Sequence, residues 1–248
     1  MGRAGRAGHG PGTRTDEGVG VVGVVGARGG AGATVTAALL AAELARRSTT
    51  VLVETGPGPS VDTVLGLEAH PGLRWPDLTG ARGAVDATLL AGNLMRWGPC
   101  AVLPTDDDRP GLPPPDVLPD VLEALVLGHR SVVLDLDRSA MLTGTGVADL
   151  VDACRTVLVV VPRDVPGVAG ARVLHALLTG RQTRVGVVAR GPAPGGLGPA
   201  EVGQAVHLPV VGSLPWSPGL GAAVDRGAGP QPSRAVRRAV TRLAGRLG

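Results

Sequence analysis

Short runs of valine and leucine alternate with longer amphipathic stretches along this chain of 248 residues. Short apolar runs that end in Gly, Pro or Asp are typical of strands buried on both faces of a sheet. Such strands are predicted at residues 19–25, 50–54, 101–103, 131–135, 156–161, 184–189 and 208–213. Helices are predicted at residues 33–47, 121–127, 147–153, 168–178 and 233–247. This alternation predicts an α/β fold with a doubly wound, mostly parallel sheet and helices on both faces.

Three segments lack this pattern. Residues 1–17 are rich in Gly and Arg, which predicts a disordered tail before one domain at residues 18–248. Residues 104–119 and 191–199 are rich in Pro or Gly and are predicted to be loops. No apolar run reaches the ~18–20 residues that cross a bilayer, and no signal peptide is evident, so a cytoplasmic protein is expected.

The composition limits what the core and the surface can contain. The sequence has no Phe, Tyr, Ile or Lys, so its 24 basic residues are all Arg and its core must consist mainly of Val, Leu and Ala. A net charge of +3 does not by itself indicate a nucleic-acid partner. Cys100 and Cys154 match no metal-binding or redox spacing and are predicted to be buried thiols.

The most informative segment is a glycine-rich loop between the first strand and the first helix. Residues 26–34 read GARGGAGAT. Glycines allow successive backbone N–H groups to point at one anion, and the N-terminus of the following helix adds its dipole. The loop therefore predicts a phosphate-binding site at the carboxyl end of the first strand.

A dinucleotide site is the alternative interpretation of these glycines. Residues 18–23 spell G-x-G-x-x-G, but this match falls before and within the strand, where such a fingerprint cannot bind a pyrophosphate. A site that uses the later glycines, with Glu54 on the ribose, stays open because Glu54 ends the second strand at a suitable distance.

Four ordered motifs resemble the ParA/MinD family of P-loop proteins. Residues 28–34, RGGAGAT, resemble the deviant Walker A loop K-G-G-x-G-K-S/T, most closely that of the CpaE/TadZ and septum-site-determining (Ssd) branch. Residues 51–54 and 61–68 resemble the second-strand motif and the helix after it, and residues 132–135 resemble Walker B. Residues 208–215 and 222–229 resemble the closing segment of the family.

The resemblance implies a set of ligand-binding residues. Thr34 and Asp135 correspond to the Mg²⁺ ligands, and ATP or ADP with Mg²⁺ is the implied cofactor. The implied nucleotide-binding residues are Arg28, Gly29, Gly30, Ala31, Gly32, Ala33, Thr34, Val35 and Pro215.

The sequence departs from the family at positions whose side chains take part in hydrolysis. Ala33 replaces the lysine inside the loop, and Gly56 replaces the carboxylate that positions the attacking water. Each such group is commonly worth a few kcal/mol, so hydrolysis is expected to fall by roughly 10³-fold or more, and no catalytic residue is assigned. Ala189 stands where the family has an adenine-reading Asn, which leaves the base specificity open. Arg28 keeps the cation of the signature lysine, which reaches across a dimer in the family.

The function implied by the resemblance is regulatory or positional. We expect a nucleotide-dependent homodimer that recruits cell-division, pilus or secretion machinery, in the cytoplasm or at the pole, septum or membrane surface. An active partitioning or cargo-positioning ATPase is the alternative. A third interpretation is an inherited loop that binds no nucleotide.

The last helix has a basic stripe beside an apolar stripe. Arg234, Arg238, Arg242 and Arg246 follow i+4 spacing. Relatives in the family use such helices on membranes or DNA, but without an aromatic anchor we favour a helix packed on the sheet with its arginines in solvent.

Other polar residues give weaker signals. Asp106, Asp107 and Asp108 are predicted to form a solvated turn rather than a metal site. The histidines, including His70, His129 and His175, are scattered and predict no triad. Trp216 follows the closing motif and could stack on a purine or pack in the core.

Overall fold

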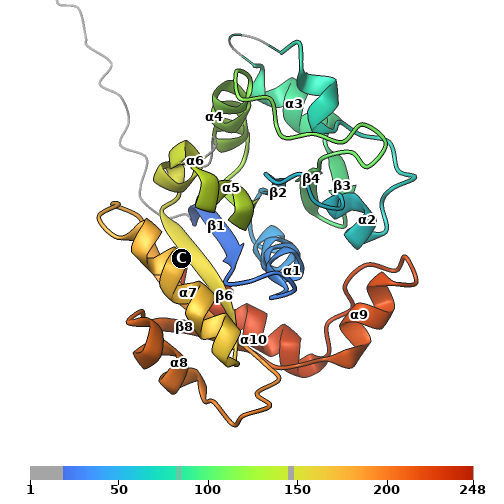
Figure 1. Cartoon of the computed structure of the whole chain (residues 1–248). Helices are drawn as coiled ribbons and strands as arrows, with labels where there is room; N and C mark the ends of the chain where they lie inside the picture. The colour runs from blue at the N-terminus through green and yellow to red at the C-terminus, as the bar shows by residue number, and fades with distance from the viewer. Residues whose placement is uncertain (1–18, 82, 84, 145–147, 248) are drawn as a thin grey trace, which may run out of the picture.

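The computed structural model describes residues 19–81, 83, 85–144 and 148–247, and its strands form one eight-stranded sheet (Figure 1). The strand order is β3-β4-β2-β5-β1-β6-β7-β8, and all neighbours are parallel except β3 and β4. The strands are β1 (Gly20–Gly26), β2 (Thr50–Glu54), β3 (Met95–Trp97), β4 (Cys100–Leu103), β5 (Ser131–Asp135), β6 (Thr156–Pro162), β7 (Arg184–Arg190) and β8 (Val210–Leu214). The predicted doubly wound, mostly parallel sheet is confirmed.

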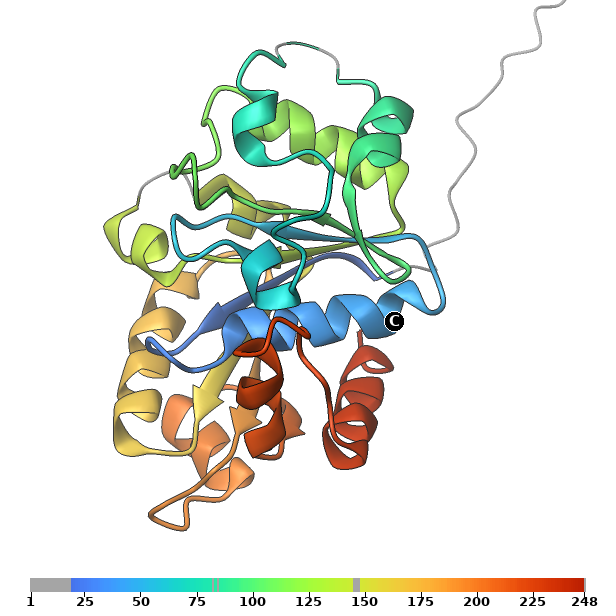
Figure 2. The same ribbon diagram turned by 90° about the vertical axis from the view of Figure 1, so that its right-hand side faces the viewer.

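Helices cover both faces of the sheet. One face carries α3 (Ala87–Asn93), α4 (Leu118–Gly128), α5 (Arg138–Thr143), α6 (Ala148–Ala153), α7 (Val165–Leu178) and α8 (Pro199–Val206). The other face carries α1 (Ala33–Ala45), α2 (Val61–Leu65), α9 (Pro218–Val224) and α10 (Arg234–Ala244). Figure 2 shows α1 lying along the sheet, with α9 and α10 on the same side. A short 3₁₀ helix, η1 (Trp75–Leu78), follows α2.

The seven predicted strands are all present, and the elements that were not predicted are short or polar. The antiparallel edge strand β3 has three residues. Helix α5 lies between the predicted strand at 131–135 and the predicted helix at 147–153, where no element was predicted. Its start depends on the side chain of Asp137, which accepts hydrogen bonds from the N–H groups of Ser139 and Ala140. The predicted disordered tail at residues 1–17 lies outside the described residues, so it is not tested.

Valine side chains build most of the central core, as the composition requires. In β1, Val21 and Val25 face one side of the sheet, and Val22 and Val24 face the other. Val24 and Val25 are fully buried. The strand is therefore fixed by apolar packing on both faces, which leaves only its carboxyl end available for a ligand.

The connections of β1 and β5 open a crevice at their carboxyl ends. The chain leaves β1 through α1 on one face, and leaves β5 through α5 and α6 on the other face. Ligands in doubly wound sheets bind at such a divergence. The glycine-rich loop after β1 and Asp135 at the end of β5 therefore meet in this crevice.

Helix α10 is packed on the sheet as favoured above. Its apolar residues Val236, Val240 and Leu243 are buried, and Arg234, Arg238 and Arg242 are exposed. These apolar side chains are therefore buried in the core. Among the described residues, no helix combines the length and apolar character that crossing a membrane requires.

We predict that Trp75→Ala destabilises the fold by about 3–5 kcal/mol, because it empties a large buried site. The indole is 1% exposed, and its Nε1 donates a hydrogen bond of 2.8 Å to the carbonyl of Glu54. Urea unfolding followed by circular dichroism measures the loss. Trp216→Ala is the matched control, since that side chain is 54% exposed, and an equal loss in both variants would contradict the prediction.

Candidate functional site

A pocket of about 410 Å³ lies at the carboxyl ends of β1, β2 and β5. Three segments line it: the glycine-rich loop, the turn after β2 and the start of α5. They contribute Gly26 and residues 28–34, then Glu54, Gly56, Gly58 and Pro59, and finally residues 135–139. Seven of the predicted nucleotide-binding residues, 28–34, therefore lie together in one pocket.

The loop holds the N-terminus of α1 open toward this pocket. Gly30 and Gly32 have φ values of 69° and 80°, a conformation that glycine adopts without strain. No side chain caps α1, so the first N–H groups of this helix are left for a ligand. Free backbone donors at a helix N-terminus form an anion site, as the sequence predicts.

Thr34 and Asp135, the predicted Mg²⁺ ligands, both line the pocket. Burial raises the pKa of Asp135 to about 7, and the nearby charges of Glu54 and Asp137 act in the same direction. The Thr34 hydroxyl is close enough to the carboxylate to oppose them by stabilising its charged form. A buried carboxylate beside a hydroxyl is an oxygen pair suited to a hard cation, which would relieve the crowding of negative charge.

Arg28 is paired within its own chain. Its Nη2 lies 2.6 Å from Oδ2 of Asp164, and its Nε lies 3.4 Å from Oδ1 of the same side chain. The hydrogen bond from Arg28 holds the pKa of Asp164 below its usual range. Asp164 also caps α7 by accepting from the N–H of Gly167 at 2.7 Å. Asp164 was not among the predicted site residues, although an acidic residue two positions before a Pro is a helix-start signal.

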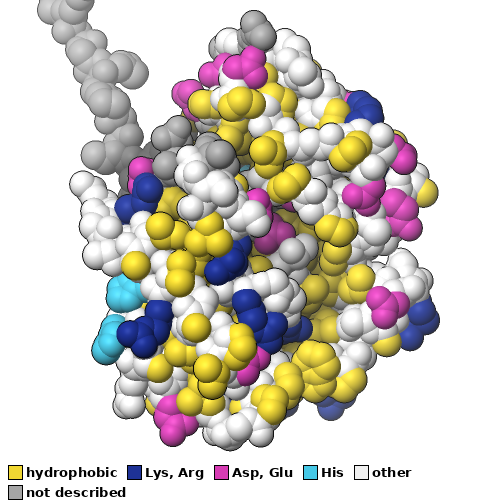
Figure 3. Space-filling model, viewed as in Figure 1, with side chains coloured by type: hydrophobic (Ala, Val, Ile, Leu, Met, Phe, Trp, Pro, Cys, Tyr) yellow, Lys and Arg dark blue, Asp and Glu magenta, His cyan; other side chains and the backbone are white. Residues whose placement is uncertain are grey.

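A second arginine lines the pocket from the other side. Arg138, the first residue of α5, is half-buried, and its Nε donates a hydrogen bond of 3.0 Å to the carbonyl of Ala27. No sequence motif marked it. Figure 3 shows basic and acidic side chains mixed near the middle of this face of the molecule. Ala33, where the family has a lysine, contributes only a methyl group to the lining.

Asp137 occupies the space that a side chain at Gly56 would need. A Cβ at this position would lie 2.8 Å from Cβ and 3.2 Å from Cγ of Asp137. Asp137 therefore occupies the space beside the turn, and its own carboxylate is bonded to the N–H groups at the start of α5.

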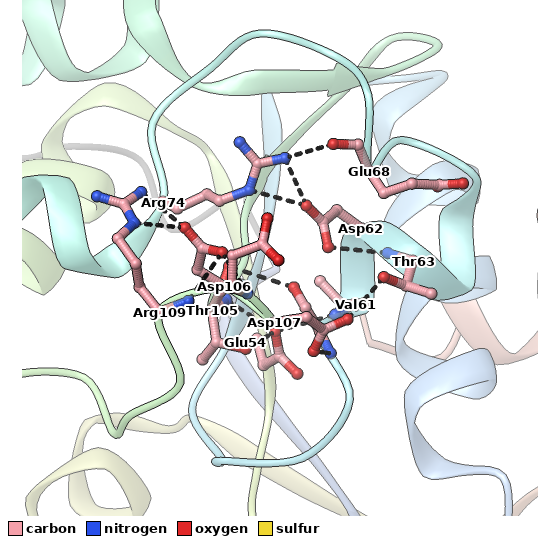
Figure 4. A network of polar contacts seen from close by, with 12 residues as sticks. Glu54, Val61, Asp62, Thr63, Glu68, Arg74, Thr105, Asp106, Asp107 and Arg109 are labelled. Carbon is pink, nitrogen blue, oxygen red and sulfur yellow. Dashed lines mark hydrogen bonds and ion pairs between the residues drawn. The ribbon is translucent and has the colours of Figure 1, made fainter.

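Glu54 is the centre of a polar network that holds the turn after β2 (Figure 4). Its Oε2 accepts hydrogen bonds from the N–H groups of Val61 and Thr105 and from the Thr105 hydroxyl, at 2.8–3.0 Å. Burial raises its pKa against the effect of these bonds. Because the side chain is 4% exposed and its Oε2 accepts three hydrogen bonds, its geometry favours a structural role over ribose binding.

The remaining predicted ligand residues do not reach the pocket. Val35 packs against the core on the α1 side, and Pro215 is exposed after β8. Neither lines the pocket, so these two assignments stay predictions. Trp216 is exposed rather than in the core, and the guanidinium of Arg190 lies 5.8 Å from its ring centroid. Ala189 is fully buried.

The other candidate residues have structural partners. Asp106 pairs with Arg109, and Asp107 accepts hydrogen bonds from the Ser60 N–H and the Thr63 hydroxyl. Nδ1 of His129 and of His175 each lies at hydrogen-bond distance from a backbone carbonyl. Within the described part of the chain, no group of three or more His, Cys, Asp or Glu side chains could hold a metal ion.

The two cysteines are buried thiols, as predicted. Burial raises the pKa of both Cys100 and Cys154 to about 12. Such thiols are unreactive at neutral pH.

Comparison with known structures identifies the fold. A ParA family ATPase from Chlorobium tepidum superposes with a TM-score of 0.77 at 16% identity, over 92% of this chain and 98% of that one. The cell division ATPase MinD of Pyrococcus furiosus gives 0.74 at 17% identity, over 92% and 97%. The septum site-determining protein MinD of Pyrococcus horikoshii, complexed with Mg-ADP, gives 0.73 at 16% identity, over 92% and 95%. The chain thus has the P-loop fold of ParA/MinD-type ATPases.

Comparison of sequences finds relatives in Mycobacterium tuberculosis. The uncharacterized protein Rv3660c of strain H37Rv is 36% identical over 212 residues, which cover 84% of this chain and 57% of that protein. The uncharacterized protein MT3760 of strain CDC 1551 gives the same values. The chain therefore spans a little over half the length of the curated relatives that it matches. No family model matches the sequence.

We predict that Asp135→Asn stabilises the protein at pH 8 but not at pH 4. The pKa of Asp135 is about 7 in the folded protein, against 3.8 for an ordinary Asp side chain, so the folded state holds the proton more tightly. Ionisation of the unfolded chain therefore lowers the stability as pH rises from about 4, until the loss levels off above pH 7 at a few kcal/mol. Asn cannot ionise and avoids this loss. Thermal melts of both proteins without Mg²⁺ across this range measure the difference, and a pH-independent difference would contradict it.

Proposed function

We propose that this chain is a regulatory or positioning protein of the ParA/MinD family, of the CpaE/TadZ-like or Ssd branch, which binds nucleotide and hydrolyses it weakly or not at all. One observation carries the proposal. The pocket keeps the glycine-rich loop and the Thr34–Asp135 pair, whereas it lacks a lysine at Ala33 and has no room for a side chain at Gly56.

The residues of the pocket fit a Mg²⁺-nucleotide. The N–H groups of the loop and of the first turn of α1 would bind the phosphate oxygens. Thr34 and Asp135 would hold the cation, which supplies positive charge beside the phosphates when it is bound. These contacts depend on the backbone and on two retained side chains, so binding does not require the groups that the site has lost.

The lost groups matter mainly for hydrolysis. Phosphoryl transfer depends on positioning and on stabilising the charge that develops in the transition state. Without a loop lysine and a carboxylate at position 56, this charge and the attacking water lack two of their usual partners. A bound nucleotide would therefore remain intact for longer. It would act as a ligand that stabilises one state of the protein rather than as a source of energy.

Arg28 links the pocket to assembly. Its side chain is 38% exposed, and its guanidinium pairs with Asp164. In a two-fold dimer that joins the loop faces, Arg28 would leave Asp164 and contact the phosphates of the partner subunit. Such a dimer would present a surface for cell-division, pilus or secretion machinery at the pole, septum or membrane. Membrane contact through α10 is not favoured, because the apolar residues of α10 are buried. DNA contact through its exposed arginines is not part of this proposal.

An active partitioning or cargo-positioning ATPase is the second candidate. It is favoured by the carboxylate of Asp137, whose carbon atoms lie where a side chain of residue 56 would begin. From there, Asp137 could orient a water molecule in place of the missing residue.

We predict negligible steady-state ATP hydrolysis, well below the ~1 s⁻¹ of ordinary enzymes, because of Ala33 and Gly56. Phosphate release with Mg-ATP is the measurement. The control is the double variant Thr34→Ala, Asp135→Ala, which removes the cation ligands. A rate near 1 s⁻¹ that this variant abolishes would support the active ATPase instead.

We also predict a dimer that depends on nucleotide, because two facing Arg28 side chains repel unless phosphates lie between them. Sedimentation velocity at micromolar concentration, with and without a non-hydrolysable ATP analogue, measures it. Arg28→Ala should remain a monomer. Asp164→Asn keeps an acceptor for the α7 cap, removes the competing charge, and should dimerise at a lower analogue concentration. A wild-type monomer under both conditions overturns the dimer.

A further inference from the structure

We propose that Arg138 supplies, from within the same chain, the positive charge for phosphate groups that the glycine-rich loop lacks at Ala33. The ligand class assigned to the pocket is then a di- or triphosphate rather than a monophosphate. This inference rests on the proposed function, because it concerns the same pocket.

The guanidinium of Arg138 lies beside the glycine-rich loop. Arg138 lies at the start of α5, directly after Asp137, and it lines the pocket together with the loop residues. Its Nε donates to the carbonyl of Ala27 at 3.0 Å, which ties the guanidinium to the base of the loop. A phosphate chain bound by the loop would therefore lie between the backbone donors and this side chain.

Acidic side chains surround Arg138 in the pocket. Three carboxylates line the pocket: Glu54, Asp135 and Asp137. Arg28 is already paired with Asp164 at 2.6 Å. Arg138, by contrast, makes no ion pair with any residue that the structure describes, and its only hydrogen bond there is to a neutral carbonyl. Its two terminal nitrogens are therefore available to an anionic ligand.

The chemistry of a guanidinium also suits phosphate groups. A guanidinium stays charged at every relevant pH and can bind two phosphate oxygens with two parallel hydrogen bonds. A side chain anchored through Nε loses little freedom when its terminal nitrogens bind a ligand. Lysine at position 33 would extend from the loop itself, whereas Arg138 approaches from α5. The charge can thus be present although the sequence contains no lysine.

Isothermal titration with Mg-ADP, AMP and inorganic tripolyphosphate tests this assignment. A hydrogen bond to a charged group is worth about 1.5–3 kcal/mol, so Arg138→Ala should weaken tripolyphosphate and ADP binding by roughly 10- to 100-fold and AMP binding less. Arg138→Lys should recover part of the loss, and added salt should reduce it. Arg172→Ala is the matched control, because Arg172 is exposed on α7 and does not line the pocket. This control should bind like the wild type.

A rescue variant separates a contribution of charge from a contribution to loop geometry. Ala33→Lys added to Arg138→Ala should restore tripolyphosphate binding, because it returns a cation to the pocket without restoring the bond to Ala27. Equal binding by the wild type and Arg138→Ala overturns the inference and leaves the proposed function intact. Equal loss in Arg138→Ala and Arg138→Lys, with no rescue, also overturns it, since Arg138 then acts only by positioning the loop. A wild type that binds none of the three ligands overturns the proposed function and this inference together.

Discussion

The backbone hydrogen bonds that pair β5 with β1 on one side and with β2 on the other determine where the charged groups of the pocket lie. In this register Asp135 stands opposite Val24 of β1 and opposite Glu54 of β2. Valine side chains on both faces fix the three strands, and a shift by one residue would place polar groups in the core. The glycine-rich loop, the buried carboxylates of Glu54 and Asp135, and the start of α5 consequently meet at the carboxyl ends of these strands.

The sequence predicts this frame well because buried parallel strands have a strong local signal. Residues 50–54 and 131–135 were predicted with the bounds that β2 and β5 have. Asp164 and Arg138 were missed because their roles depend on segments that approach the loop only in the folded chain: they lie 136 and 111 residues away from their partners Arg28 and Ala27. Asp137 was missed for the same reason, and its position excludes a side chain at Gly56. Local pattern thus predicts the loop, and tertiary packing decides which charges reach it.

The proposed function would separate two properties of the pocket that usually occur together. Binding of phosphates relies on backbone donors, which any sequence with suitable glycines can supply. Acceleration of phosphoryl transfer relies on side chains that match the transition state better than the bound nucleotide. Ala in place of Lys and Gly in place of a carboxylate would affect the second property more than the first. A protein with the proposed function would retain a ligand-dependent shape while its turnover declined.

The Arg28–Asp164 pair has a further consequence for how assembly would respond to solution conditions. In the proposed dimer, Arg28 would leave the carboxylate of Asp164 for a phosphate group of the partner subunit, so one contact between unlike charges would replace another. An exposed ion pair such as Arg28–Asp164 is worth only about 0–1 kcal/mol, so breaking it would cost little. A phosphate chain carries more negative charge than one carboxylate, so the new contact would be the stronger of the two and would lose more when salt screens it. Assembly would therefore weaken as the ionic strength of the surrounding medium rises.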